Sequence, residues 1–158
     1  MSPAQFEAML IKHEGMRLHP YKDSVGKVTI GIGRNLDDNG ITEEEAIYLM
    51  RNDIETHAKD LANHFPIVRD LDDVRYYVLV NMAFNLGIVR LAGFKKMWGC
   101  ITTGDYEGAS LEMLDSKWAD QVGNRAVELS QMMKTGETLE EEEDSGSTRR
   151  LTRRGYRG

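Results

Sequence analysis

Residues 14–33 read EGMRLHPYKDSVGKVTIGIG, and this stretch decides the fold class. In residues 27–33, apolar side chains alternate with polar residues or glycine, which predicts a half-buried strand. The turn-forming sequence DSVG comes directly before it, so residues 16–21 are predicted to pair with this strand in a hairpin. Asp23 would then lie at the hairpin turn.

Thr29 lies inside the predicted strand, and its place in the alternation indicates where its side chain points. The apolar residues of the strand share the opposite face, and they are Val28, Ile30 and Ile32. A hydroxyl on the other face suits a cleft rather than a core. We therefore predict that Thr29 faces a cleft.

Helical patterns surround this hairpin on both sides. Ser2, Pro3 and Gln5 have the form of a capping box with proline at the first helical position, so a helix is predicted from Pro3 to about Glu14. Cap residues and 3.6-residue periodicity predict further helices over residues 42–65, 73–86, 94–103, 105–116 and 124–133.

The order of these elements predicts an α+β protein, because the strands are segregated from the helices instead of alternating with them. A small β-containing lobe is predicted at about residues 15–60. A long helix joins it to a larger helical lobe at about 61–136, which also takes in the helix over residues 3–14. Residues 137–158 form a charged tail that is predicted to be flexible; if it were helical, its arginines would form one basic stripe.

The composition excludes several classes of protein. With 158 residues, the chain is long enough for one domain with a sizeable core. Its formal net charge of −6 disfavours a nucleic-acid binder that relies on positive charge. Cys100 is the single cysteine, so no intramolecular disulfide can form. Residues 76–84, the longest nearly apolar stretch, are too few for a membrane span, and the first residues lack the pattern of a secretory signal.

The ordered motifs of the chain resemble those of the phage-type lysozymes, which are the endolysin muramidases of glycoside hydrolase family 24. The matching residues of the first part are Glu14-Gly15-Met16-Arg17-Leu18, Tyr21-Lys22-Asp23, Gly26 and Thr29-Ile30-Gly31-Ile32-Gly33. Those of the second part are Ile41-Thr42, Glu45-Ala46, Asn81-Met82, Phe84, Gly87, Ala92-Gly93-Phe94, Ser116-Lys117-Trp118 and Asn124-Arg125-Ala126. The resemblance implies a lysozyme-like fold with an active-site cleft between the two lobes.

The resemblance implies hydrolysis of the β-1,4 bond between N-acetylmuramic acid and N-acetylglucosamine in peptidoglycan. Such cleavage needs one carboxylic acid to protonate the leaving oxygen and one carboxylate on the other face of the sugar. By similarity, Glu14 is the proton donor, Asp23 is the base or nucleophile, and Thr29 helps to position a water. No cofactor is expected. No metal site is predicted either, because the histidines lack the spacing of ligands.

The resemblance also implies three substrate-binding residues. Asn35 stands where relatives have an apolar cleft residue, and Phe84 matches a cleft-lining phenylalanine, with core packing as the alternative. Arg125 matches a cleft arginine that could compensate the acid at the end of the first helix, so its replacement should cost more activity than stability. A surface arginine is the alternative. Met97 and Glu112 replace residues that are often small and polar in relatives.

The biological role implied by the resemblance is lysis of an infected bacterium. The protein is expected to act as a monomer on peptidoglycan, with no nucleic acid and no stable membrane insertion. It would accumulate in the host cytoplasm and reach the wall after release through a separate pore-forming holin. Two alternatives remain open: a lytic transglycosylase, and a non-catalytic wall-binding or structural module of a phage particle.

Overall fold

A computed structural model describes residues 1–139, 142–144 and 147–149. The chain divides into two compact units, residues 1–50 and 51–158. A three-stranded antiparallel sheet lies in the first unit and most of the helices lie in the second, which confirms the α+β class. The division falls inside a long helix, near residue 50 rather than residue 60, and the N-terminal helix groups with the sheet.

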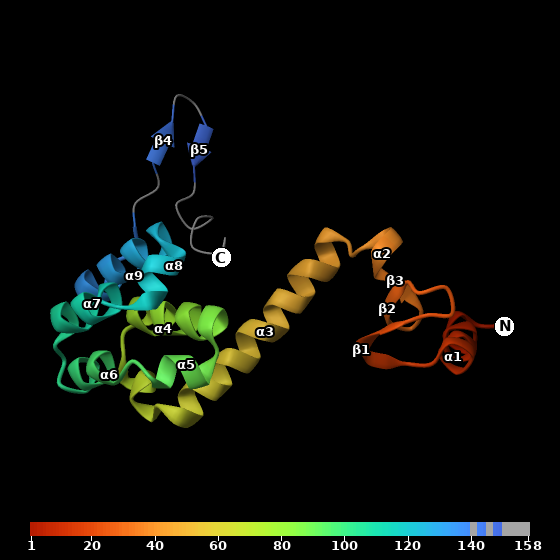
Figure 1. Ribbon diagram of the computed structural model, residues 1–158, viewed down its shortest axis with the longest axis horizontal. Helices are drawn as coiled ribbons and strands as arrows, with labels where there is room; N and C mark the ends of the chain where they lie inside the picture. The colour runs from red at the N-terminus through yellow and green to blue at the C-terminus, as the bar shows by residue number, and fades with distance from the viewer. Residues whose placement is uncertain (140–141, 145–146, 150–158) are drawn as a thin grey trace. The chain divides into compact units, whose positions relative to one another are not determined.

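The first unit combines two helices, a small sheet and the start of a long helix. Its elements are α1 (Pro3–Glu14), β1 (Arg17–Lys22), β2 (Val28–Gly31), β3 (Arg34–Asn35), α2 (Leu36–Asn39) and the first turns of α3 (Glu43–His64). The strands follow the order β1-β2-β3 across the sheet, and α2 comes directly after β3 (Figure 1). Helix α1 begins with the predicted capping box, in which Ser2 and Gln5 each accept the other's backbone N–H.

The predicted hairpin is confirmed, because β1 and β2 pair antiparallel with Lys22 opposite Val28. The predicted strand over residues 27–33 is too long. Strand β2 ends at Gly31, and the chain then turns back into β3, which the sequence did not predict. Gly31 and Gly33 have φ values of +70° and +74°, a conformation that glycine adopts without strain. The residues expected to extend the strand therefore form a turn.

Burial along β2 differs from the prediction. Thr29 is only 4% exposed and is the one buried residue among residues 1–50, whereas Val28 and Ile30 are half-buried. Ile32 lies in the turn and is 41% exposed. Thr29 is therefore more buried than the apolar residues of the strand, and its place beside a cleft stays a prediction. Thr29 can be buried because its hydroxyl is hydrogen bonded to the carbonyl of Lys27.

Polar contacts, rather than a buried apolar core, tie the sheet to α3. Arg34 donates from Nη1 and Nη2 to the two carboxylate oxygens of Glu45, at 2.8 and 2.9 Å, and from Nη1 also to the carbonyl of Gly40. Glu45 and Thr42 form the predicted capping box at the start of α3. The hydrogen bond from Arg34 lowers the pKa of Glu45 to about 2. This stabilising contact is therefore lost only as the pH falls towards that value.

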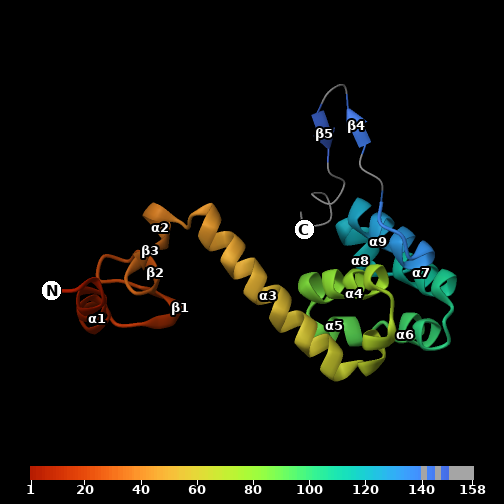
Figure 2. The ribbon, with the colours of Figure 1, turned by 180° about the vertical axis from the view of Figure 1, so that it is seen from behind.

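The second unit is helical and contains the hydrophobic core. After α3 come a 3-10 helix η1 (Pro66–Asp70), α4 (Asp73–Leu86), α5 (Ile88–Ala92), α6 (Lys95–Thr102), α7 (Tyr106–Leu114), α8 (Lys117–Val122) and α9 (Asn124–Thr135). The helices predicted in this region are confirmed, with ends that differ by a few residues, while η1, α5 and α8 were not predicted. Helices α7 and α9 lie side by side in both views (Figures 1 and 2).

Helix α4 supplies much of the core and buries six residues, which are Val78, Leu79, Val80, Met82, Ala83 and Leu86. Trp98 and Trp118 are also buried. Each indole N–H donates to an oxygen, that of Trp98 to the carbonyl of Leu91 and that of Trp118 to the side chain of Asn85. Among the described helices, none is long and apolar enough to cross a membrane.

Two short strands follow the last helix. β4 (Glu142–Asp144) pairs antiparallel with β5 (Ser147–Arg149). They fall within the tail that was predicted to be flexible. Since Arg149 lies in a strand, a helical arginine stripe does not form at that position. The other arginines of the predicted stripe lie outside the described residues: Arg150, Arg153, Arg154 and Arg157.

Candidate active site

The Glu14 side chain lies against the backbone of the turn between β2 and β3. Glu14 is the last residue of α1. Arg17, three residues after Glu14, pairs with Gly31 at the end of β2, and this pairing brings the end of α1 close to the turn. A Cβ atom placed on Gly33 would lie 2.9 Å from Oε2 of Glu14, which is closer than Cβ atoms in proteins approach other heavy atoms. Only glycine at position 33 leaves room for the carboxyl group in this position.

Replacing Gly33 by alanine is expected to disturb Glu14. The added methyl group would push the carboxyl group away, and the φ of +74° would cost about 1 kcal/mol of stability. Gly104→Ala is a matched control, because Gly104 has a φ of +77° but no atom within 4 Å of a new Cβ. Urea unfolding should show a similar loss for both variants. For the wall hydrolysis that the sequence predicts, a wall-clearance assay should show about a tenfold slower rate for Gly33→Ala alone. Equal rates for the two variants would contradict a role of Gly33 in placing Glu14.

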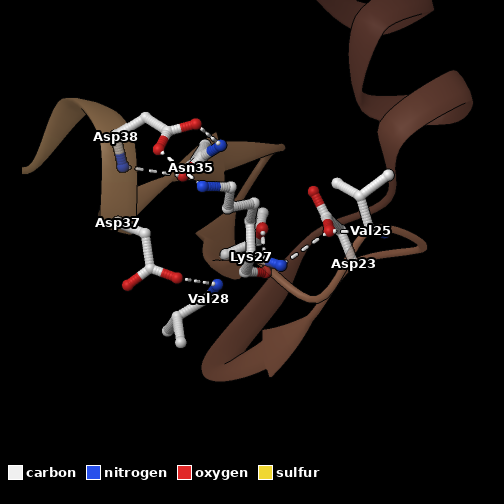
Figure 3. Close-up of polar contacts among 8 residues, drawn as sticks. Asp23, Val25, Lys27, Val28, Asn35, Asp37 and Asp38 are labelled. Atoms are coloured by element: carbon white, nitrogen blue, oxygen red, sulfur yellow. Dashed lines mark hydrogen bonds and ion pairs between the residues drawn. The ribbon is translucent and has the colours of Figure 1, made fainter.

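The Asp23 carboxylate is held at the hairpin turn by backbone donors. Its Oδ1 accepts the N–H groups of Val25 and Lys27, both at 2.9 Å (Figure 3). The backbone N–H of Asp23 in turn donates to the carbonyl of Lys27 at 2.9 Å. Among the described residues, no hydrogen bond reaches Oδ2 of Asp23. The turn therefore orients the carboxylate and leaves one oxygen available for a water or a ligand.

The backbone of Lys27 joins Asp23 to Thr29. The carbonyl of Lys27 accepts the Thr29 hydroxyl at 3.0 Å as well as the Asp23 N–H. The structure therefore brings these two predicted catalytic residues to the beginning of β2. Glu14 contacts the turn that follows the other end of the same strand. Of the three residues predicted to be catalytic, Thr29 thus lies within β2, while Asp23 and Glu14 contact the segments that come before and after this strand.

Asn35 has its side chain engaged at the start of α2. Its Oδ1 accepts the backbone N–H of Asp38 at 3.0 Å, and its Nδ2 donates to Oδ2 of Asp38 at 2.9 Å. It is therefore the N-cap of this helix. A substrate contact of Asn35 stays a prediction, and it would have to coexist with the cap.

A pocket of about 750 Å³ lies in the first unit, within the size range of small-molecule sites. Its lining comes from the turn after β2, from the start of α3 and from the segment between them. The lining residues are Ile30, Gly31, Ile32, Gly33, Arg34, Asn35, Asn39, Ile41, Glu44, Glu45, Tyr48 and Leu49. Since Gly33 also contacts Glu14, the pocket adjoins the predicted proton donor.

Phe84, Met97 and Glu112 belong to the second unit. Phe84 is half-buried, with its ring centroid 5.6 Å from the ring of His57, and it lies outside the core cluster and the residues packed against it. The alternative that Phe84 is a core residue is therefore not supported.

Met97 and Glu112 line a separate pocket of about 430 Å³ together with Gly93, Phe94, Lys95, Lys96, Asp115 and Ser116.

Arg125 is buried in the second unit, with 4% of its surface exposed. From α9 it donates through Nε and Nη2 to the side-chain oxygen of Asn81 in α4, at 3.0 and 2.8 Å. Arg125 is therefore not a surface arginine. Its role next to a substrate stays a prediction, and the structure adds a role in joining two helices.

Replacing Arg125 by alanine is expected to lower the free energy of unfolding by about 2 kcal/mol, because the Asn81 oxygen loses both donors. Urea unfolding monitored by circular dichroism measures this loss. Arg69→Ala at an exposed position is the control and should be close to neutral. An unchanged stability of Arg125→Ala would show that the contact between α4 and α9 contributes little. From the sequence alone, replacement of Arg125 was expected to lower activity more than stability.

Sequence reasoning gave no role to the side chains of Lys27, Asp37 and Asp38. Asp37 accepts the backbone N–H of Val28 at 2.8 Å, and Lys27 forms a 3.0 Å ion pair with Asp38 (Figure 3). The spacing of Asn35 and Asp38 is a helix-start signal that could have revealed α2. Among the described residues, no group of three or more His, Cys, Asp or Glu side chains could hold a metal ion.

Comparison with known proteins gives consistent matches. The family model described as "Phage lysozyme" matches residues 11–135. The chain is 31% identical over 156 residues to the pre-baseplate central spike protein Gp5 of Enterobacteria phage T4, covering 81% of this chain and 27% of the spike protein.

Two further relatives have lengths closer to that of the chain. One is probable T4-type lysozyme 1 of Dictyostelium discoideum, 28% identical over 157 residues, with 81% of this chain and 92% of the relative covered. The other is an endolysin of Acyrthosiphon pisum secondary endosymbiont phage 1, 29% identical over 115 residues, with 70% and 75% covered. The chain therefore spans most of these two relatives and about a quarter of the spike protein.

Proposed function

Because the chain belongs to the phage lysozyme family, we propose that it is a muramidase. It hydrolyses the β-1,4 bond between N-acetylmuramic acid and N-acetylglucosamine in bacterial peptidoglycan. The family match over residues 11–135 carries this proposal, because it includes Glu14, Asp23 and Thr29. The grouping of these three residues around β2 supports it.

In the proposed reaction, Glu14 donates a proton to the glycosidic oxygen as the bond to the anomeric carbon breaks. Asp23 accepts a proton from the water that attacks this carbon, or attacks the carbon itself if the reaction proceeds through a covalent intermediate. Thr29 helps to position the water. The two backbone N–H groups on Asp23 Oδ1 support this role, because they hold the carboxylate in one orientation before the substrate arrives.

Substrate binding is proposed to involve Asn35, Phe84 and Arg125. The pocket that includes Asn35 adjoins Glu14 through Gly33, which supports a saccharide contact there. Phe84 presents a half-buried ring outside the core, and aromatic rings are common in the lining of ligand sites. For Arg125, the support is the family motif alone, since its described hydrogen bonds go to Asn81.

The proposed biological role is lysis of an infected bacterium. The protein acts as a monomer on the cell wall, after a separately encoded holin has released it from the host cytoplasm. The endolysin among the relatives supports this role. Co-expression in a bacterium tests it: lysis should follow when a holin is expressed with the chain, and the chain alone should leave the culture intact. Lysis without the holin would overturn the dependence on a separate pore.

The enzymatic proposal is tested on purified peptidoglycan and on Gram-negative cells with a permeabilised outer membrane. Hydrolysis should clear the cells and release fragments that end in reducing N-acetylmuramic acid. A lytic transglycosylase would instead produce 1,6-anhydromuramic ends, because it uses no water. Absence of clearance by the folded protein would overturn the proposed activity.

A second candidate function, that of a structural module in a phage particle, is favoured by one observation. The chain is 31% identical to part of a protein named as a central spike. Purified virions of a phage that encodes the chain distinguish the two roles. A module of the particle would be found in the virions in a fixed ratio to the other structural proteins, whereas an endolysin would be found only in the lysate.

A further inference from the structure

The peptide unit between Lys27 and Val28 is hydrogen bonded on both sides. Its carbonyl oxygen accepts the Thr29 hydroxyl and the Asp23 N–H, and its own N–H, that of Val28, donates to Oδ2 of Asp37 at 2.8 Å. A peptide unit is planar, so the acceptor on one edge fixes the direction of the carbonyl on the other edge. We propose that Asp37 is a positioning residue for Asp23 and Thr29. This inference rests on the proposed muramidase function.

The short third strand explains why Asp37 is needed. β3 pairs with β2 only at Asn35 and Arg34, and α2 begins at Leu36. The backbone hydrogen bonding between β2 and β3 therefore ends before it reaches Val28. The N–H of Val28 points to the side where β3 would have continued. Asp37, in the first turn of α2, supplies the acceptor that a longer strand would have provided.

Helix α2 is attached to the sheet by a second contact. Asp38 accepts Lys27 Nζ at 3.0 Å on Oδ1 and the Asn35 amide at 2.9 Å on Oδ2. The side chains of Lys27 and Asp38 are 43% and 52% exposed, and exposed ion pairs contribute little. Asp37 is also exposed, but its hydrogen bond goes directly to the peptide unit whose carbonyl accepts from Asp23 and Thr29, so it is the contact that acts on these two residues.

Loss of the acceptor on Asp37 would free the peptide unit to rotate. Its carbonyl would then move away from the Thr29 hydroxyl and from the turn that holds Asp23. Small displacements of groups that orient a reacting water cost large factors in rate. The substrate contacts proposed at Asn35 and in the second unit would persist. We therefore expect an effect on kcat and little effect on KM.

The test compares Asp37→Leu with Asp37→Asn. Leucine has a similar size and no acceptor, whereas asparagine keeps an oxygen that can accept the Val28 N–H. With soluble, uncrosslinked peptidoglycan strands as substrate, kcat of Asp37→Leu should fall by about tenfold with KM unchanged. Asp37→Asn should stay within about twofold of the wild type, since hydrogen bonding rather than charge does the positioning. A kcat of Asp37→Leu equal to that of the wild type would overturn the proposal, and so would an equal fall for both variants.

Hydrogen exchange of the Val28 amide, measured by NMR, follows the contact itself. The amide should be protected in the wild type and in Asp37→Asn, and should exchange faster in Asp37→Leu. Unchanged protection in the leucine variant would also overturn the proposal. If Asp37→Leu does not fold, Asp37→Ala takes its place in both measurements with the same expected results.

Asp53→Leu is the matched control for the substitution, because Asp53 is exposed on α3 and has no hydrogen bond or ion pair with the described residues. It should leave kcat, KM and the Val28 amide unchanged. An inactive wild type would refute the muramidase function itself, and with it any positioning role. An active wild type with unaffected Asp37 variants would refute the positioning role alone.

Discussion

Replacing Glu14 by glutamine should slow peptidoglycan hydrolysis by about a thousandfold, which is in the range of the contribution of a general acid. Glutamine has nearly the same shape, so it can occupy the space against Gly33. Its amide cannot deliver a proton to the leaving oxygen. The measurement is the initial rate of clearance of permeabilised Gram-negative cells, with the folding of each protein checked by circular dichroism.

Glu7→Gln is the matched control for this experiment. Glu7 is an exposed residue of the same helix, with no hydrogen bond or ion pair to the described residues, and its replacement should leave the rate unchanged. A Glu14→Gln variant that clears cells as fast as the wild type would remove Glu14 from the mechanism. Loss of activity in both variants would point to an effect on α1 as a whole.

Replacing Asp23 by asparagine should lower the rate of hydrolysis by about a hundredfold without changing stability. The asparagine oxygen can still accept the N–H groups of Val25 and Lys27, so the turn keeps its shape. The negative charge that would receive the proton of the attacking water is lost. Initial rates and urea unfolding of the same preparations measure the two effects separately.

Asp23→Ala separates the two roles of this side chain. Alanine removes the charge and also leaves the two N–H groups without their acceptor, so this variant should lose about 1 kcal/mol of stability in addition to activity. Asp53→Asn is the control for loss of a negative charge at an exposed position. If Asp23→Asn were as unstable as Asp23→Ala, the hydrogen bonds of the turn would depend on charge.

The main helices could be predicted from the sequence because their signals are local. Ser2 with Gln5 and Thr42 with Glu45 form the predicted capping boxes, and these contacts involve residues three apart. The short elements α2, α5 and α8 were missed. A helix of four to six residues has too few turns to show a periodic pattern, and its existence depends on what it packs against.

The candidate site shows the same division between local and tertiary information. The acid, base and water-positioning roles of Glu14, Asp23 and Thr29 were proposed from the resemblance of their ordered motifs to those of the phage-type lysozymes. The contact of Glu14 with Gly33 could not be predicted, because it depends on how the chain turns after β2. The burial of Thr29 could not be predicted either, because alternation identifies two faces of a strand but not which of them is covered.

The sequence by itself determined the α+β class, the main helices, the hairpin and the family, since each of these depends on local spacing or on an ordered set of motifs. Only the tertiary structure decided that β3 ends after two residues and that Asp37 then holds the peptide unit beside Asp23 and Thr29. It also decided that Arg125 is buried against Asn81. The physical reason is that these contacts join residues brought together by chain reversal and helix packing, which leave no periodic trace in the sequence.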